Sequence, residues 1–158
     1  MQEEKFMTQE SGRSLIEIIG VMAIAGVMTV GAVKMYNMIR NNNARTIAAA
    51  ELKQIAADTK TLMGLRGTYE GVSVDYLIKS GALKNERAPI GGDAWSVTSG
   101  TDGATFSINL VGLTSGECDY FTTATPTWAK SIRVNGFETE PGSHCFSSAT
   151  NEISFIVE

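Results

Sequence analysis

The chain contains few of the residues that build metal centres and catalytic sites. Its 158 residues include one histidine, two cysteines and three prolines, and the formal net charge is −4. Two distant cysteines, with no histidine or further cysteine at a ligand spacing, do not form a zinc motif. The net negative charge argues against nucleic-acid binding, because proteins that bind nucleic acids through bulk charge carry an excess of lysine and arginine. We therefore expect neither a metal site nor a nucleic-acid partner.

The acidic residues and glycines of the later chain also lack a functional spacing. The scattered carboxylates are Asp93, Asp102, Asp119, Glu138 and Glu140. They form no calcium-binding loop, and we interpret them as solvated surface or turn residues. The glycines form no phosphate-binding motif. We expect no cofactor and no enzyme activity.

One long apolar run lies near the start of the chain. Leu15–Val33 comprises 19 residues, of which only Glu17 is charged. As a helix it would span roughly 28 Å, close to the hydrocarbon thickness of a bilayer. An unpaired ionisable group in such a segment costs about 2.5–3.5 kcal/mol or more, so Glu17 is a candidate functional residue.

The residues before this run complete a recognisable pattern. Gly12–Glu17 reads GRSLIE, and Glu17 is the fifth residue after Gly12. With the apolar helix behind it, the pattern resembles the cleavage and assembly signature of type IV pilins. The resemblance implies that a prepilin peptidase cuts between Gly12 and Arg13 and methylates the new N-terminus at Arg13. It also implies that Glu17 is the assembly carboxylate.

The later chain carries a second part of the resemblance. Cys118 and Cys145 lie late in the sequence, as in the C-terminal disulfide loop of pilins. The stretch Phe106–Leu110, running into GLTSGEC, is similar to type IVb pilins in particular. Arg13 stands where most family members have an apolar residue.

The resemblance gives Glu17 a partner. After cleavage Arg13 would carry a free α-amine, which can meet Glu17 of a neighbouring subunit in an apolar filament core. Removing one partner of such a buried pair costs about 3–5 kcal/mol, so the pair would set the axial register of incoming subunits. The alternative is a Glu17 that reaches the membrane surface or is protonated.

The N-terminus has one competing interpretation, a conventional secretory signal peptide. Such a peptide has a basic start, a shorter apolar core and a small-x-small cleavage site, and the small residues within the run permit a cut there. Here the start is acidic and the run is longer. Lys34, Arg40 and Arg45 follow the run, so the positive-inside rule favours the opposite topology. The cytoplasmic leader and external head are therefore implied by the resemblance alone.

The cysteines have two interpretations. In a cytosolic protein, Cys118 and Cys145 would be unrelated buried thiols, whereas outside the inner membrane they would pair. The apolar anchor favours pairing, which closes a loop of 28 residues counting both cysteines. Such a bridge is worth about 3.5 kcal/mol on the chain-entropy account. His144 and Cys145 would otherwise suggest a thiol–imidazole pair, but a disulfide is the better use of Cys145.

The apolar run continues into an amphipathic stretch, and residues 14–63 are predicted to form one helix. The inward face recurs at spacings of four and three residues, and Gly64 and Gly67 end the helix. Residues 1–12 are predicted to be unstructured, and 41–43, three asparagines, mark a kink or the exit from the bilayer. Glycines inside the run, such as Gly26 and Gly31, either allow close helix packing or let the helix loosen in a filament. The inward-facing residues are Ala48, Leu52, Ile55, Thr59 and Leu62.

The remaining chain breaks into short elements. We predict helices over 73–83, capped by Ser73, and 115–123, capped by Ser115, with strands over 95–98, 105–111, 131–134 and 153–157. The expected fold is α+β, a long N-terminal helix packed on a small, mainly antiparallel sheet. Aromatic residues of this part either form a sugar- or surface-binding patch or pack in the core and between subunits. They are Trp95, Tyr120, Phe121 and Trp128.

These observations predict a structural, non-enzymatic protein. Its expected parts are a leader (1–12), a transmembrane or filament-core half-helix (13–36), and an amphipathic half-helix with a globular head (37–158). By resemblance the partners are identical subunits, the prepilin peptidase and an inner-membrane assembly platform. The precursor would reside in the inner membrane and the filament outside the cell. The alternatives are a pseudopilin or minor pilin of a secretion system, and a membrane-anchored periplasmic binding protein.

Overall fold

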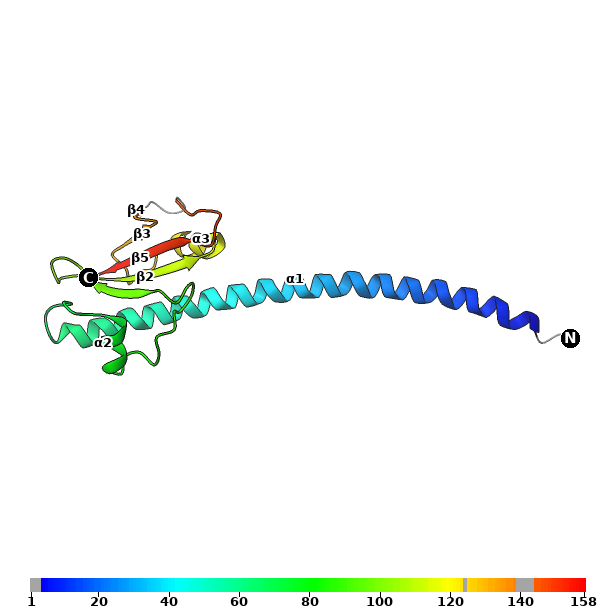
Figure 1. Ribbon diagram of the computed structural model, residues 1–158, viewed down its shortest axis with the longest axis horizontal. Helices are drawn as coiled ribbons and strands as arrows, with labels where there is room; N and C mark the ends of the chain where they lie inside the picture. The colour runs from blue at the N-terminus through cyan, green and yellow to red at the C-terminus, as the bar shows by residue number, and fades with distance from the viewer. Residues whose placement is uncertain (1–3, 124, 139–143) are drawn as a thin grey trace. The chain divides into compact units, whose positions relative to one another are not determined.

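The computed structural model describes residues 4–123, 125–138 and 144–158, with side chains from Leu15 onward (Figure 1). The chain divides after Asn43 into two compact units. In chain order the elements are α1 (Glu4–Gly64), α2 (Val74–Lys79), β1 (Ser96–Ser99), β2 (Phe106–Leu113), α3 (Ser115–Thr123), β3 (Ser131–Val134), β4 (Phe137–Glu138) and β5 (Asn151–Val157).

Helix α1 begins earlier than the sequence predicted. Its first residue is Glu4, so the expectation of an unstructured segment over 1–12 is wrong for residues 4–12. This stretch, EKFMTQESG, is rich in good helix formers and has no proline, and adding residues to an existing helix needs no new nucleation. The three asparagines at 41–43 are helical as well. The helix ends at Gly64, as predicted, and Gly67 follows with a φ of +73°.

The second unit contains a five-stranded antiparallel sheet. The strand order is β1-β2-β5-β3-β4, which places the last strand of the chain in the centre (Figure 1). The predicted strands are all present. Strand β4 was not predicted, because two residues are too few to show an alternating pattern. It follows β3 through a two-residue turn at Asn135 and Gly136, both of which have the positive φ that tight hairpins require.

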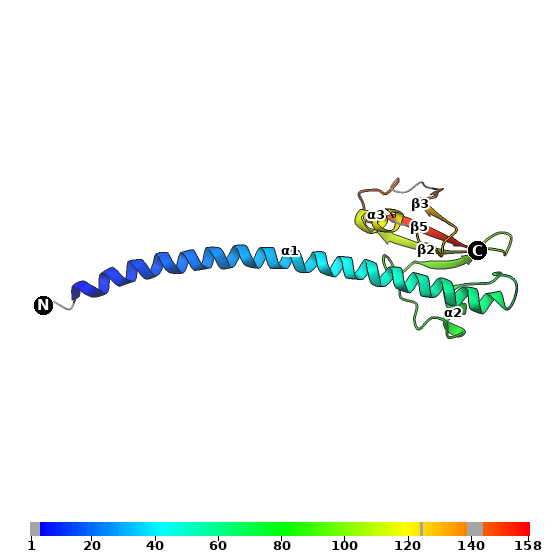
Figure 2. The same cartoon turned by 180° about the vertical axis from the view of Figure 1, so that it is seen from behind.

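The core of this unit lies between the sheet and residues 44–64 of α1. Figure 1 and Figure 2 both show this part of the helix along the sheet, with α2 on the helix's other side. Alternate residues of the strands are buried, and one row across β2, β5 and β3 consists of Ile108, Phe155 and Ile132. The predicted inward face of the helix is correct, with Leu62 only partly buried. The helix also buries Ala56 and Met63, which the sequence analysis did not assign.

Strand β2 contains a bulge that shapes one end of the core. Its register with β5 shifts between Leu110 and Leu113, and both of these residues are buried. Gly112 lies between them with a φ of +68°. The extra residue keeps the side chains on both sides of the bulge in the core. The segment containing Gly91 and Gly92 lies against β2 at this bulge, and the Gly92 N–H donates to the Val111 carbonyl at 2.7 Å.

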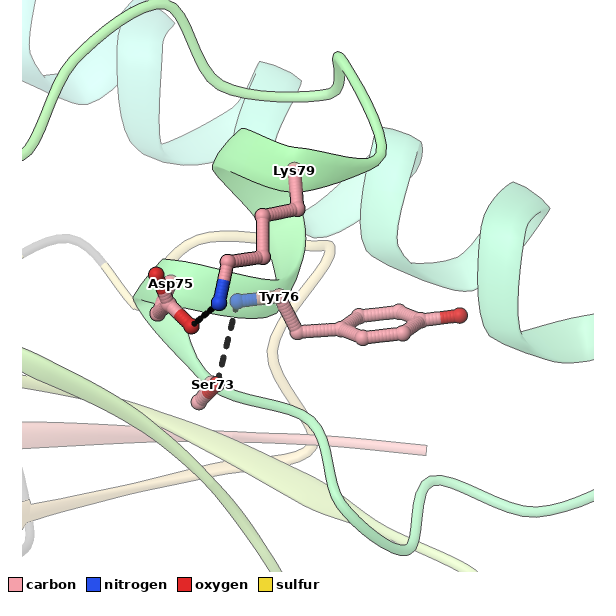
Figure 3. A network of polar contacts seen from close by, with 4 residues as sticks. All are labelled: Ser73, Asp75, Tyr76 and Lys79. Atoms are coloured by element: carbon pink, nitrogen blue, oxygen red, sulfur yellow. Dashed lines mark hydrogen bonds and ion pairs between the residues drawn. The ribbon is translucent and has the colours of Figure 1, made fainter.

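Helix α2 starts at the predicted cap. The Ser73 hydroxyl accepts a hydrogen bond from the Tyr76 N–H at 3.1 Å (Figure 3). One turn along, Lys79 pairs with Asp75 at 2.6 Å on the exposed side, which is worth only a few tenths of a kcal/mol. The helix is shorter than predicted and ends at Lys79.

Helix α3 has its predicted bounds, but its cap is Thr114 rather than Ser115. The Thr114 hydroxyl accepts from the Glu117 N–H at 3.3 Å, and the Glu117 carboxylate accepts from the Thr114 N–H at 2.8 Å. This reciprocal arrangement is a capping box, and the T-x-x-E spacing specifies it better than a serine one residue later.

A buried threonine hydroxyl in the core has no hydrogen-bond partner among the described residues. Thr59 is fully buried, and its hydroxyl makes no hydrogen bond. Thr59→Val should therefore raise the free energy of unfolding by about 1 kcal/mol, since it removes an unsatisfied hydroxyl at nearly constant volume. Denaturant unfolding of the full-length chain in detergent measures this change.

Thr61→Val is the matched control for Thr59. The Thr61 side chain is exposed, and its hydroxyl donates to the Ala57 carbonyl at 2.9 Å. Its replacement should change the stability by less than about 0.5 kcal/mol. A Thr59→Val protein less stable than this control would show that the buried hydroxyl contributes to the fold.

Candidate functional site

The apolar half of α1 exposes its side chains on every side. From Leu15 to Ile39 each large apolar side chain is between 51% and 76% exposed. Within the part of the chain that the structure describes, α1 is also the helix long and apolar enough to cross a membrane, judged by length and composition. So much apolar surface is far beyond the few hundred Å² that soluble monomers leave in water. By length and composition this helix suits an apolar environment, either lipid or other protein chains.

Glu17 lies on this apolar surface. Its side chain is exposed in the single chain, and it has no ion pair with any described residue. Toward the C-terminus the next charged residue along α1 is Lys34, so the helix provides no cation between Glu17 and that lysine. Gly12 and Arg13 belong to the α1 backbone, and their side chains lie outside the described part. A countercharge for this carboxylate would come from another molecule, from the membrane surface or from the N-terminal residues.

A disulfide joins Cys118 on α3 to Cys145, with the two Cα atoms 5.9 Å apart. Cys118 is fully buried and Cys145 is partly buried against the core. The bond connects α3 to the chain entering β5. Because Cys145 is bonded in this way, it offers no thiol to His144, whose ring instead stacks on Phe137 at 5.0 Å. A thiol–imidazole catalytic pair is therefore not formed.

Asn151, at the start of β5, is a polar centre that the sequence analysis missed. Its side chain is fully buried, and its amide nitrogen lies 2.9–3.1 Å from the carbonyls of Leu113, Phe146 and Ser148. Its amide oxygen accepts from the Phe146 N–H at 2.6 Å and from the Asn135 side chain at 3.1 Å. The residue fixes the segment between the disulfide and β5. The sequence does contain a clue to this role. Asn151 is the first residue of NEISFIV, a segment in which apolar and polar residues otherwise mostly alternate.

Asn151→Leu should cost about 2–4 kcal/mol of stability, because it leaves buried backbone groups without partners. Asn109→Ala provides the matched control. Asn109 donates to Ser96 and Thr98 on the outer, partly exposed face of the sheet, so its loss should cost less than about 1 kcal/mol. Thermal unfolding of both full-length variants in detergent compares the two. Equal losses would contradict the central role of Asn151.

Of the aromatic candidate residues, two lie in the core and two lie nearer its surface. Trp95 and Phe121 are buried, and the Trp95 indole N–H donates to the Glu86 carbonyl at 2.7 Å. Trp128 packs against the core, whereas Tyr120 is 40% exposed. Over the residues with described side chains, no three histidine, cysteine, aspartate or glutamate side chains gather as a metal site would require. Glu140 lies outside the described residues.

Comparisons by sequence found no match for this chain. No family model matches it, and no curated protein matches its sequence. The comparison of folds is informative. The crystal structure of TcpA, a type IV pilin from Vibrio cholerae El Tor biotype, superposes with a TM-score of 0.57 at 17% sequence identity. The match covers 73% of this chain and 99% of that chain.

The chain has a type IV pilin fold. The pilin fold accounts for the long N-terminal helix and for the small antiparallel sheet packed on its second half. At this level of identity the match concerns the fold, and the functional argument depends on the residues themselves. The two features that stand out are the exposed apolar helix with one carboxylate and a head in which a disulfide and Asn151 hold the last strand.

Proposed function

We propose that this pilin-like chain is a structural subunit of a type IV pilus-like filament. The observation that carries the proposal is the apolar half of α1, which is exposed on all sides and holds a single carboxylate, Glu17. In a bilayer this helix anchors the precursor, and in a filament the same surface packs against identical helices. The same apolar surface of α1 thereby serves both the membrane-anchored precursor and the assembled filament.

Processing at Gly12 precedes assembly in this proposal. A prepilin peptidase cuts between Gly12 and Arg13, and Arg13 receives the methyl group. The new α-amine of Arg13 pairs with Glu17 of a neighbouring copy, which neutralises both charges in the apolar filament core. An inner-membrane platform adds each subunit, and the head, tied by its disulfide, faces the outside of the cell, where a disulfide persists.

Two measurements test this function. Mass spectrometry of the mature N-terminus should find a chain that starts at Arg13, with or without a methyl group. Electron microscopy of sheared surface material should find filaments that contain the chain. A full-length protein that retains Met1 and never forms filaments would instead be the membrane-anchored binding protein. A chain that starts at Arg13 but is confined to a short periplasmic structure would be a pseudopilin or minor pilin.

A further inference from the structure

Leu65 is an apolar side chain that lies in solvent at one end of the second unit. It is 91% exposed, the highest value among the large apolar side chains that the structure describes. It follows Gly64, the last residue of α1, and the Arg66 N–H still donates to the Met63 carbonyl at 2.9 Å, so the chain keeps turning at this point. A single exposed leucine is ordinary on a protein surface, so its meaning depends on whether the same molecule offers a place for it.

An apolar pocket opens toward the other end of the same unit. Its volume is about 240 Å³, and it lies where α3 and the segment after it meet α1. One of its walls is the Tyr120 ring, which is 40% exposed. All of the lining side chains are aliphatic or aromatic: Ala49, Leu52, Tyr120, Phe121, Pro126 and Trp128.

Leu65 and this pocket lie at different heights and on roughly opposite sides of α1. Leu65 comes 16 residues after Ala49 and 13 residues after Leu52, which places it about 20–24 Å further along the helix direction. At about 100° per residue, the two intervals turn the helix by about 160° and about 220°, on either side of a half-turn. Both views show α3 at one end of the sheet and the end of α1 at the other (Figure 1 and Figure 2).

This placement suits an open filament of parallel copies. Each contact in such a filament joins two different patches, and an exposed apolar side chain that enters a pocket elsewhere on the next copy builds a fibre. A copy displaced by about 20–24 Å along the helix, with little rotation, brings its pocket level with Leu65 of the copy before it. Ile47 is also exposed, at 61%, but it lies at the height of the pocket itself and would need a neighbour without displacement.

The charges beside the two patches are complementary. Arg66, next to Leu65, is exposed and makes no ion pair with a described residue. Helix α3, which lines the pocket, carries Glu117 and Asp119 and neither lysine nor arginine. The Arg45 guanidinium lies against the start of α3 but pairs with neither carboxylate. A leucine beside an arginine therefore matches an apolar pocket beside two carboxylates.

We propose that Leu65 of one copy inserts into the pocket between α1 and α3 of the next copy, with Arg66 facing the carboxylates of α3. The occupant of the pocket is a second copy of this chain, identified by the placement of the two patches and by their charges. The contact rests on the proposed function, because it forms only in an assembled filament. It joins the globular parts of successive copies, in addition to the packing of their apolar half-helices.

Cross-linking between engineered cysteines tests the contact directly. Filaments of the double variant Leu65→Cys, Ala49→Cys are treated with a short bis-maleimide, which joins two thiols that lie within its reach. Cysteine keeps an apolar side chain at Leu65, and the native cysteines are bonded to each other and offer no thiol. Sheared filaments should give a ladder of multimers on a denaturing gel. The links must join different copies, since about 24 Å of helix separates the two positions within one chain.

The matched control is the double variant Leu65→Cys, Ile47→Cys. Ile47 is more exposed than Ala49 and lies two residues before it, on the other side of the helix. Its thiol is therefore at least as accessible to the reagent, yet this pair should give no ladder. A ladder from the Ala49 pair that is no stronger than that of the control overturns the contact.

Leu65→Ser supplies a second test, which separates assembly from stability. The side chain is 91% exposed, so the melting temperature should not change measurably. The filament yield should fall about tenfold, because the apolar side chain that leaves water on docking is lost. Ala49→Leu, which fills the pocket from α1, should lower the yield by a similar factor, and the double variant should be no worse than either alone. Leu65→Met should assemble normally.

The outcomes separate this contact from the proposed function. A normal filament yield from Leu65→Ser overturns the contact and leaves the filament role intact. Losses that multiply in the double variant do the same, as do filaments in which no neighbouring copies are displaced by about 20–24 Å. A wild-type chain that never forms filaments overturns the proposed function and the contact with it.

Discussion

Glu17→Ala is expected to abolish filaments while the precursor still enters the membrane. The substitution makes α1 more apolar, so insertion should be unaffected or improved. In an assembled filament it leaves the α-amine of a neighbouring copy buried without a countercharge, at a cost of about 3–5 kcal/mol per contact. Filament yield should therefore fall by more than about a hundredfold. Immunoblots of sheared surface material against membrane fractions measure both quantities.

The control for Glu17→Ala is Thr29→Val. Thr29 lies in the same apolar segment, and its hydroxyl donates to the Ala25 carbonyl of its own helix at 2.7 Å. Removing this polar group touches no contact between copies that involves charge, so filaments should form in normal amounts. If the Glu17→Ala protein also forms filaments in normal amounts, the carboxylate has no assembly role, and membrane-surface contact or protonation becomes the explanation for its position.

The sequence predicted best those features that depend on local chemistry. The C-terminal end of α1, the cap at Ser73 and the strand at Ser131–Val134 follow from glycines, capping residues and alternation, which act over a few positions. The beginning of α1 was wrong because polarity was taken as a sign of disorder. A polar segment attached to a long helix extends that helix at little cost.

The features that the sequence analysis missed depend on contacts between distant segments. The bulge at Gly112 depends on where β5 pairs with β2, and Asn151 acquires its role only when the chain around Phe146 lies beside it. The bulge has no signal within a window of neighbouring residues, and the asparagine at the start of NEISFIV marks a position without identifying its partners. Glu17 differs again, since its spacing from Gly12 marked it in the sequence. The expected partner of Glu17 belongs to another copy of the chain. The structure of a single chain therefore shows where Glu17 lies but cannot show that contact.

Loss of the disulfide is expected to cause the largest change in the stability of the head. Without the bond, the unfolded chain regains the freedom of a 27-residue separation, which corresponds to about 3.5 kcal/mol. Cys118 is also fully buried, so the double variant Cys118→Ala, Cys145→Ala adds a small cavity term. The melting temperature of the full-length chain in detergent should fall by about 10–20 °C.

The disulfide and Asn151 hold the same segment from its two ends, which makes their combination informative. Both restrict the conformations of the chain between α3 and β5. When the cysteines are already replaced, this segment is partly released. The loss of stability caused by Asn151→Leu should then be smaller than in the wild-type background. A reductant should lower the melting temperature of the wild-type chain and leave the cysteine-free variant unchanged. Two free thiols in the mass of the native protein, or a wild-type melting temperature that ignores the reductant, would show that the bond does not stabilise the head. Strictly additive losses of stability would show that the disulfide and Asn151 act on separate parts of the fold.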